Sequence, residues 1–321
     1  TSMNQTIIKM AQTFTGANNI PMFIPISTGF GDRVNGRSKA SSARYIDTSY
    51  NRHVMDLMFP REDDWLLNYN YEDGQQAEPK YYVPIVPYSI METTTTTAVG
   101  WKIDVWARSY ESVMMNLKRM LAFEYPRPAG KPISFQGKVW IKPGMRVILG
   151  RTPTGEKYSE ICLGDYKINK ETEVITVTQL PLKIWSEKFK CSLLGIATKK
   201  KTGDNKNDKD ESRRDESDEC ESKEYVEKIN DNTGNDQNEI IIKLKPGSLA
   251  QINDEYGSES MDPVEDYLGL YKIMTPQLNM IDANGAVREF DTYESVMEYW
   301  FLLRKDLYIA RLERQTIILE L

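Results

Sequence analysis

The spacing of apolar residues predicts two helices in the first half of the chain. Residues 1–15 place their apolar side chains on one broad face, which is the pattern of an amphipathic helix. Residues 109–123 do the same, with Lys118 and Arg119 on the opposite face. Helical periodicity also returns briefly over residues 50–57. Residues 1 to about 58 are therefore expected to form helix, loop and short strand.

A longer helical pattern runs from about residue 292 to the end. Its apolar residues recur at alternating intervals of four and three, and only Arg314 interrupts the series. Such spacing is typical of a helix with a coiled-coil seam. Asp291 and Glu294 make a candidate capping pair at its start.

Strand patterns dominate the middle of the chain. Short β-branched runs separated by Pro and Gly predict strands at residues 139–141, 146–149, 173–178 and 239–244. Asn284-Gly285 is a strong hairpin signal and should join residues 278–281 to 286–289. Residues 60–88, rich in proline, acids and aromatics, predict an extended connection.

Residues 199–238 differ in kind from the rest of the chain. Between Gly203 and Glu224 the only residue that counts as apolar is Cys220, and acids and bases alternate. Such a segment buries too little surface to offset its ordering entropy, which predicts a disordered or poorly packed insertion. A tail that binds a partner is the alternative.

Composition changes this picture little. The 321 residues, 40% hydrophobic and 27% charged, are those of an ordinary globular protein with room for two or three domains. Three scattered cysteines form neither a disulfide framework nor a metal-ligand spacing, and His53 is the single histidine. No apolar run approaches membrane-spanning length, so no membrane partner is expected.

Charge singles out one loop. The chain carries a formal charge of −6, yet cations outnumber acids from residue 33 to 52. The charged residues of this window are Arg33, Arg37, Lys39, Arg44, Arg52 and one acid, Asp47. A basic patch in an acidic protein indicates a polyanionic partner. Tyr45 directly follows Arg44 and is a candidate nucleophile. From charge and spacing alone, a solvated loop before a half-buried tyrosine is the alternative.

The same loop carries a family resemblance. Residues 30–36, followed by residues 42–46, resemble the active-site loop of type IIA DNA topoisomerases, and more closely the eukaryotic topoisomerase II branch. Further motifs follow in the family's order: Phe59-Pro60, Asp63-Asp64, Tyr71-Glu72-Asp73, Glu78-Pro79, residues 82–87, Gly100-Trp101, Gln179-Leu180-Pro181 with Trp185, and Phe290-Asp291-Thr292. The likeness spans nearly the whole chain and is weakest at residues 125–170 and 200–238.

The resemblance implies an α+β, multidomain fold. Residues 1–88 would be the C-terminal part of a winged-helix (helix-turn-helix) DNA-cleavage domain. Residues 89–290 would form a mixed α/β tower with antiparallel strands, including the insertion at 199–238. Residues 291–321 would begin a long C-terminal coiled-coil helix. Because the chain enters its first helix without an initiator methionine, we expect it to be a fragment of the parent enzyme.

The resemblance also implies a reaction. An ATP-hydrolysing type II topoisomerase cuts and rejoins both strands of a duplex to pass another duplex and to remove supercoils and catenanes. Here Tyr45 would attack a backbone phosphorus and form a 5′-phosphotyrosyl link, while Arg44 would stabilise charge on the phosphate oxygens. Arg33, Arg37 and Lys39 would hold the duplex by its phosphates.

One departure concerns the loop before Trp101. Many relatives carry there an isoleucine that wedges between base pairs and bends the DNA. An ungapped alignment places Thr97 at the wedge, with Val99 the only large apolar alternative. Threonine is a poorer wedge, and unstacking a base step costs a few kcal/mol. This loop and the charged insertion indicate a divergent member, such as one from a large DNA virus.

Cofactors are expected only in the parent enzyme, which would use Mg²⁺ and ATP bound by segments outside this chain. Asp63-Asp64 and Glu72-Asp73 are interpreted as solvated or helix-capping acids rather than as metal ligands. The chain alone is therefore expected to bind double-stranded DNA without cleaving it. The resemblance implies a homodimer for the parent enzyme, and it leaves open whether this chain dimerises alone.

The expected location is the nucleus or another site of DNA replication, cytoplasmic for a virus. A non-catalytic DNA-binding scaffold of the same architecture is the alternative function. A general coiled-coil interaction protein would explain only residues 292–321.

Overall fold

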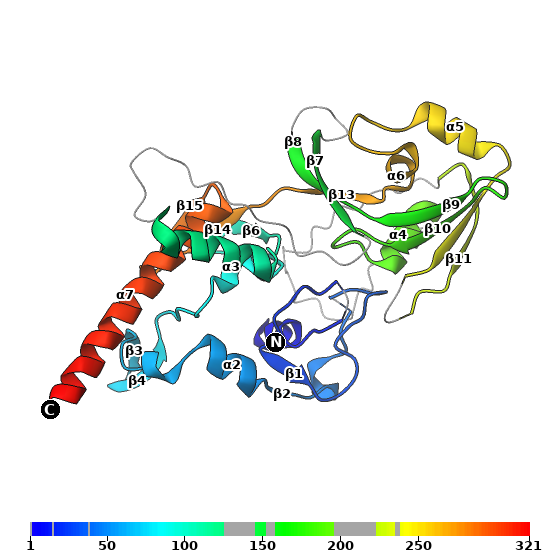
Figure 1. The fold of residues 1–321 in the computed structure, drawn as a ribbon. Helices are drawn as coiled ribbons and strands as arrows, with labels where there is room; N and C mark the ends of the chain where they lie inside the picture. Colours follow the sequence, from blue (N-terminus) through cyan, green and yellow to red (C-terminus); the bar gives the residue numbers. More distant parts are fainter. Residues whose placement is uncertain are drawn as a thin grey trace.

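The computed structural model combines helices with antiparallel sheets. It describes residues 2–14, 16–37, 39–124, 145–151, 158–195, 223–234 and 238–321. A β-rich body lies at one end of the molecule, and helix α7 projects from the other (Figure 1). The α+β class predicted from the sequence is confirmed. The strand predicted at residues 139–141 lies outside the described residues. None of the described helices is both long and apolar enough to cross a membrane.

The helices are α1 (Ser2–Met10), α2 (Arg52–Met58), α3 (Tyr110–Arg119), α4 (Ser186–Leu194), α5 (Ser248–Glu255), α6 (Pro263–Leu268) and α7 (Tyr293–Glu320). The strands are β1 (Phe23–Pro25), β2 (Thr48–Tyr50), β3 (Tyr69–Glu72), β4 (Gln75–Pro79), β5 (Thr94–Ala98), β6 (Trp101–Val105), β7 (Arg146–Arg151), β8 (Tyr158–Leu163), β9 (Asp165–Asn169), β10 (Val174–Gln179), β11 (Val226–Asp231), β12 (Ile240–Leu244), β13 (Tyr271–Met274), β14 (Leu278–Ile281) and β15 (Val287–Phe290).

The β-rich body is built on a four-stranded antiparallel sheet in the order β11-β12-β10-β9. Alternate residues of its central strands, Ile175 and Val177 on β10 and Ile240 and Ile242 on β12, are fully buried. Apolar residues of α4, α5 and α6 complete this core. A three-stranded sheet, β13-β8-β7, continues the body.

Strand β11 corrects the predicted limits of the charged insertion. Residues 226–231 pair with β12 at the edge of the sheet, although the sequence predicts an insertion as far as residue 238. Val226 and Ile229 are partly buried against the core, and this burial offsets the cost of ordering the strand. Residues 199–222 and 235–237 of the insertion lie outside the described residues.

A second core joins α3 to the start of α7. It contains Val113 and Leu117 of α3, Tyr293 and Val296 of α7, and the hairpin β14–β15, which contributes Leu278 and Phe290. Hairpin β14–β15 turns at Asn284-Gly285, as the sequence predicts. Val105 of β6 belongs to the same core, so helix α3 and hairpin β5–β6 both pack against the base of α7.

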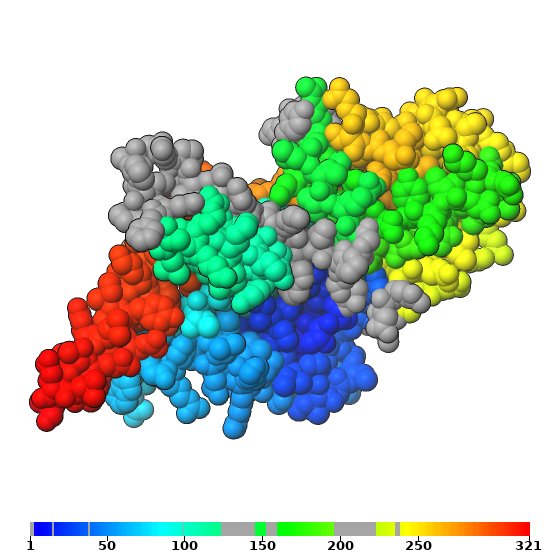
Figure 2. Space-filling model, viewed as in Figure 1, coloured from blue at the N-terminus to red at the C-terminus, as the bar shows by residue number. Residues whose placement is uncertain are grey.

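Helix α7 begins one residue later than the predicted capping pair implies. Thr292, rather than Asp291, is the N-cap, because its hydroxyl accepts a hydrogen bond from the Ser295 amide (3.2 Å). Ser295 completes the capping box in place of Glu294. The first half of α7 is packed, but its last turns are exposed and project beyond the body (Figure 2). The coiled-coil seam itself stays a prediction.

The segment 60–88 is not simply an extended connection. It contains the hairpin β3–β4, whose turn residues Asp73 and Gly74 have φ values of 49° and 79°. An Asp-Gly turn with two positive φ angles is a preferred hairpin connection, because its twist matches that of the strands. The Asp-Gly pair is thus a local signal for this hairpin, and the expectation of an extended connection is wrong here.

Candidate functional site

Tyr45 lies at the end of a short 3-10 turn, Ala43–Tyr45, and points into solvent. Its side chain is 68% exposed, and its backbone amide closes the turn on the Ser42 carbonyl (2.9 Å). The Arg44 guanidinium lies 4.8 Å from the centre of the Tyr45 ring and is also exposed. An accessible phenol beside a permanent cation is the arrangement that a nucleophile for an anionic substrate requires.

The tyrosine loop, residues 29–45, leads up to the candidate nucleophile. It opens with a tight turn, in which Asp32 accepts hydrogen bonds from the Val34 and Asn35 amides (2.9 and 2.6 Å). Gly36 has a φ of 86°, and a Cβ there would lie only 2.5 Å from Nε1 of Trp185. A glycine is needed at Gly36 because this turn packs directly on the β-rich body.

The cations of the tyrosine loop divide into two kinds. Arg33 is 6% exposed and donates to Oε1 of Gln179 (2.7 Å), and the Arg37 guanidinium bonds to the Thr93 carbonyl (2.9 Å). Lys39 and Arg44, by contrast, are exposed. Direct phosphate contact by Arg33 and Arg37, predicted from the sequence, is thus opposed by their intramolecular partners, whereas Lys39 is accessible for that role.

Thr97 and Val99 belong to the hairpin β5–β6, whereas the sequence indicates only a loop at these residues. Thr97 pairs across the strands with Lys102 and is exposed. Val99 and Gly100 form the two-residue tip, with φ values of 51° and 80°. A β-branched residue with positive φ is strained, and the Val99 side chain is 75% exposed. The tip therefore presents Val99, not Thr97, at its outermost point.

The base of this hairpin is fixed by Lys183. Its ammonium group contacts Oδ1 of Asp104 (2.5 Å) and Oγ1 of Thr95 (2.9 Å) and lies 3.8 Å from the centre of a Trp106 ring. Burial lowers the pKa of Lys183, although Asp104 acts in the opposite direction. Lys183 thus bonds to both strands of the hairpin below its tip.

Asp63 corrects the prediction of solvated or capping acids. It is 4% exposed and forms ion pairs with Arg304 and Arg311 of α7. Arg304 also donates to the Val83 carbonyl (3.0 Å). A buried carboxylate requires such partners, and no local pattern indicates that cations 241 and 248 positions away supply them. Asp64 is exposed, as expected.

Metal ligands are not grouped in the part of the chain that the structure describes. No cluster of three or more His, Cys, Asp or Glu side chains there could hold a metal ion. The exposed His53 lies in the first turn of α2. The candidate site therefore consists of an exposed tyrosine, exposed cations and an apolar hairpin tip.

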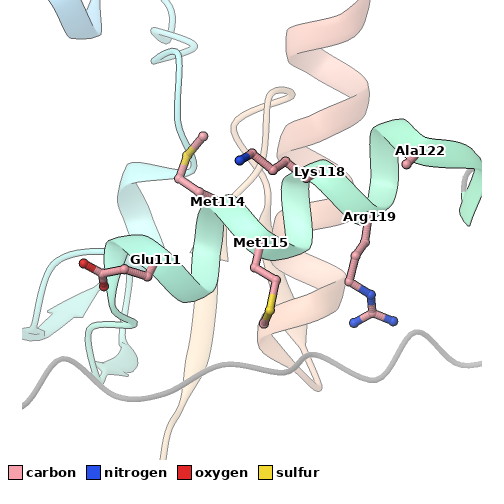
Figure 3. Close-up of a pocket in the computed structure, with 6 residues that line it drawn as sticks. All are labelled: Glu111, Met114, Met115, Lys118, Arg119 and Ala122. Carbon is pink, nitrogen blue, oxygen red and sulfur yellow. The ribbon is translucent and has the colours of Figure 1, made fainter.

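A hollow of about 540 Å³ on α3 is a separate feature (Figure 3). It is lined by Glu111, Met114, Met115, Lys118, Arg119 and Ala122. It contains no residue of the tyrosine loop or of hairpin β5–β6, so we do not assign it to the same site.

Comparison with known proteins identifies the family. The model of the family described as the A subunit of DNA gyrase/topoisomerase IV matches residues 1–320. The chain is 32% identical over its whole length to "DNA topoisomerase 2" of African swine fever virus, of which it covers 25%. This chain belongs to the type IIA DNA topoisomerases. It spans only about a quarter of the length of those viral topoisomerases.

Eukaryotic members of the topoisomerase family and a solved structure support the same family assignment. The chain is 27% identical to "DNA topoisomerase 2 top-2" of Caenorhabditis elegans over 97% of this chain and 18% of that protein. A crystal structure of the Plasmodium falciparum topoisomerase II DNA-binding, cleavage and re-ligation domain matches 99% of this chain and 38% of that one, with a TM-score of 0.74 and 25% identity. The eukaryotic-type resemblance seen in the sequence is thereby confirmed.

Proposed function

We propose that this part of a type II topoisomerase binds duplex DNA and cuts it through Tyr45. The observation that carries the proposal is the exposed Arg44-Tyr45 pair at the end of a loop whose first half is held by buried contacts. The Plasmodium domain that this chain resembles is described by its DNA-binding, cleavage and re-ligation functions, which supports the same assignment.

The chemistry exchanges one phosphate ester for another. Oη of Tyr45 attacks a backbone phosphorus, and a tyrosine–phosphate bond forms at the 5′ end. The bond to the 3′ oxygen breaks, the phenol proton is lost, and the 3′ oxygen leaves as a hydroxyl by taking up a proton. The reverse attack by that hydroxyl restores the duplex without new activation. Arg44 stabilises the charge that builds up on the phosphate oxygens.

The remaining residues position the duplex. Lys39 is exposed and suits a phosphate contact, which fixes DNA without reading its sequence. Val99, at the strained tip of hairpin β5–β6, is the residue we assign to wedging between base pairs. Residues 1–88 would then be the cleavage domain, residues 89–290 the tower and residues 291–321 the start of the coiled-coil arm.

The parent enzyme is proposed to act as a homodimer, with ATP driving strand passage, at the nucleus or another site of DNA replication. The family implies Mg²⁺, but the described residues offer no ligand cluster for it. The steps assigned to this chain therefore use its own side chains only, and we expect this chain alone not to cleave DNA.

The test is covalent trapping with the full-length enzyme in the presence of magnesium. Wild type and Tyr45→Phe are mixed with end-labelled duplex DNA and denatured, and the protein–DNA adduct is measured. We expect an adduct at the 5′ ends that is lost in Tyr45→Phe. An adduct that survives would assign the nucleophile elsewhere, and no adduct in wild type would favour the scaffold alternative.

A further inference from the structure

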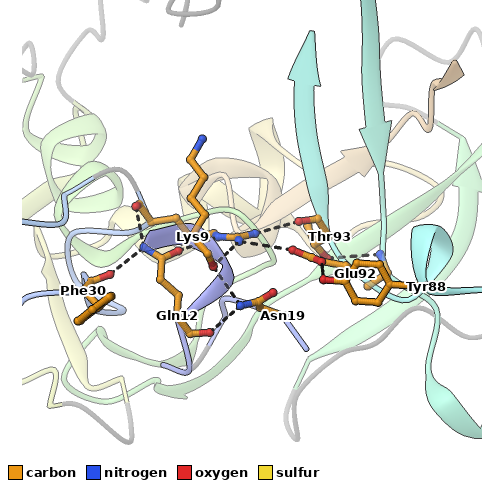
Figure 4. A network of polar contacts seen from close by, with 9 residues as sticks. Lys9, Gln12, Asn19, Phe30, Tyr88, Glu92 and Thr93 are labelled. Carbon is orange, nitrogen blue, oxygen red and sulfur yellow. Dashed lines mark hydrogen bonds and ion pairs between the residues drawn. The ribbon is translucent and has the colours of Figure 1, made fainter. Parts of the chain in front are cut away.

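A polar cluster of one buried and three partly buried side chains joins the tyrosine loop to the base of hairpin β5–β6. The side chains of this root cluster are Gln12, Arg37, Tyr88 and Glu92 (Figure 4). They come from the segment after α1, the tyrosine loop and the turn that leads into β5. The root cluster therefore connects segments that are far apart in the sequence.

Gln12 fixes the tyrosine loop at two points. It is fully buried, and its Nε2 donates to the carbonyls of Phe30 (2.7 Å) and Arg37 (2.8 Å). Its Oε1 accepts from Nε of Arg37 (2.9 Å). One amide therefore holds both the beginning of the loop and the backbone at Arg37.

Arg37 extends this connection to the hairpin. Its Nη1 donates to the carbonyl of Thr93 (2.9 Å), the residue immediately before β5. Its Nη2 reaches the Lys9 carbonyl (3.3 Å) and lies 3.9 Å from Oε1 of Glu92. The planar guanidinium thus bonds to the loop's support and to the hairpin's base at the same time, which an ammonium group cannot reproduce.

The charges of the root cluster depend on one another. Burial raises the pKa of Glu92, while Tyr88 and Arg37 favour its ionised form. Burial lowers the pKa of Arg37, against the effect of Glu92. The Tyr88 hydroxyl donates to Glu92, so the carboxylate has a partner on each side. Because a buried charge is costly without its partners, movement of the hairpin base would draw Arg37 with it.

We propose that Arg37 is a positioning residue that couples hairpin β5–β6 to the tyrosine loop, so that insertion of the hairpin tip into DNA and placement of Tyr45 occur together. This inference rests on the proposed DNA cleavage by Tyr45. The hairpin tip and Tyr45 are both exposed, whereas the connection between them runs through the buried Gln12 and the partly buried Arg37. Coupling of this kind restricts cutting to a duplex that the hairpin has engaged.

A double-mutant cycle in the full-length enzyme tests the coupling. The rate of 5′-adduct formation at saturating DNA is measured for wild type, Val99→Ala, Arg37→Lys and the double variant. We expect Val99→Ala to slow the reaction about tenfold when Arg37 is present and by less than about threefold when Lys replaces it. Equal factors in both backgrounds would show that Arg37 is merely structural and would overturn the inference.

A second readout separates bending from cutting. DNA bending is followed by energy transfer between dyes at the two ends of the duplex, in the same reactions. In Arg37→Lys the DNA should still bend to the wild-type extent while the adduct forms more slowly. If bending and cutting fall in proportion, the coupling inference is wrong.

Controls keep the two proposals distinguishable. Lys243→Ala removes a half-exposed cation from the far sheet and should leave both readouts unchanged. If Arg37→Lys does not fold, Glu92→Gln removes the ion-pair partner of Arg37 and should give non-additivity of the same sign but of smaller size. If wild type forms no adduct, or if one survives Tyr45→Phe, the proposed cleavage fails. If wild type cuts normally but the cycles are additive, only the coupling fails.

Discussion

The two halves of the tyrosine loop contain similar residues, but the cations of one half turn inward and those of the other half are exposed. In the first half, Arg33 and Arg37 turn inward and bond to the β-rich body and to the base of a hairpin. In the second half, Lys39, Arg44 and Tyr45 face solvent. The first half therefore fixes the loop, and the second half presents its chemistry.

The difference shows that a run of cations in a sequence is not one functional unit. A cation that already has buried partners has lost its hydration and gained fixed acceptors, so it contributes to stability. An exposed cation keeps its charge available for a polyanion. Site-directed changes in the two halves should accordingly affect different measurements.

The largest effect is expected at Arg44. Arg44→Ala removes the cation that we propose lies beside the reacting phosphate and should slow adduct formation by about 10²–10³-fold, the usual cost of losing a transition-state charge partner. Arg44→Lys should slow adduct formation less than Arg44→Ala does, because lysine keeps the charge but lacks the planar donors. Single-turnover cleavage by the full-length enzyme measures this. A slowing explained wholly by weaker DNA binding would contradict the assignment.

A stability effect is expected in the first half of the loop. Arg33→Ala should lower the free energy of unfolding by about 2 kcal/mol, because it removes a buried charged hydrogen bond to Gln179. The matched control is Lys39→Ala, an exposed cation of the same loop, which should stay within about 0.5 kcal/mol of wild type. Urea denaturation of the 321-residue chain compares them. Equal losses in both variants would remove the distinction between the halves.

The second half should in turn determine the salt dependence of DNA binding. Lys39→Ala should reduce the slope of log K against log salt concentration by about 0.9, the value for one phosphate contact on B-form DNA. A folded Arg33→Ala protein should keep the wild-type slope. Fluorescence titration across a series of salt concentrations measures both slopes. An unchanged slope in Lys39→Ala would exclude it from the DNA contacts.

The smallest effect concerns pH. Because burial raises the pKa of Glu92 above its ordinary value of 4.5, the folded chain binds this proton more tightly than the unfolded chain does. Stability from this group is therefore present at low pH and is lost as pH rises through the raised pKa. Compared with Glu92→Gln, wild type should gain relative stability as the pH falls from neutral toward the ordinary pKa of 4.5.

Urea denaturation at several pH values checks this trend. Glu227→Gln, at a carboxylate that is 44% exposed, controls for removing one negative charge. A constant difference between wild type and Glu92→Gln across that range would show that burial does not govern Glu92.

Much of the fold can be predicted because its signals are local. Asn284-Gly285 marks its hairpin, and the apolar spacing from residue 292 marks α7. The hairpin β5–β6 cannot be predicted in the same way, since Val99 at a positive φ is not a turn signal. Strand β11 escapes prediction because its stabilisation comes from pairing with β12, which no local pattern shows.

The candidate site is predictable only in part. Adjacency and family resemblance single out Tyr45 and Arg44, and the structure exposes both. The roles of Gln12 and Glu92 cannot be inferred, because a buried polar residue acquires its function from partners distant in the sequence. For the same reason, charge alone cannot separate Arg33 from Lys39.

The buried pairing of Asp63 with α7 has a mechanical consequence. The helix is anchored near Arg304 and Arg311, and Trp300 adds a hydrogen bond from its Nε1 to the Pro84 carbonyl (2.9 Å). Beyond those anchors the helix is exposed, with Leu319 87% exposed. The helix is thus a lever with its fulcrum at Asp63. A sideways force on the exposed part of the helix would be transmitted as torque to the segment that follows α2, where Asp63 lies 18 positions after Tyr45.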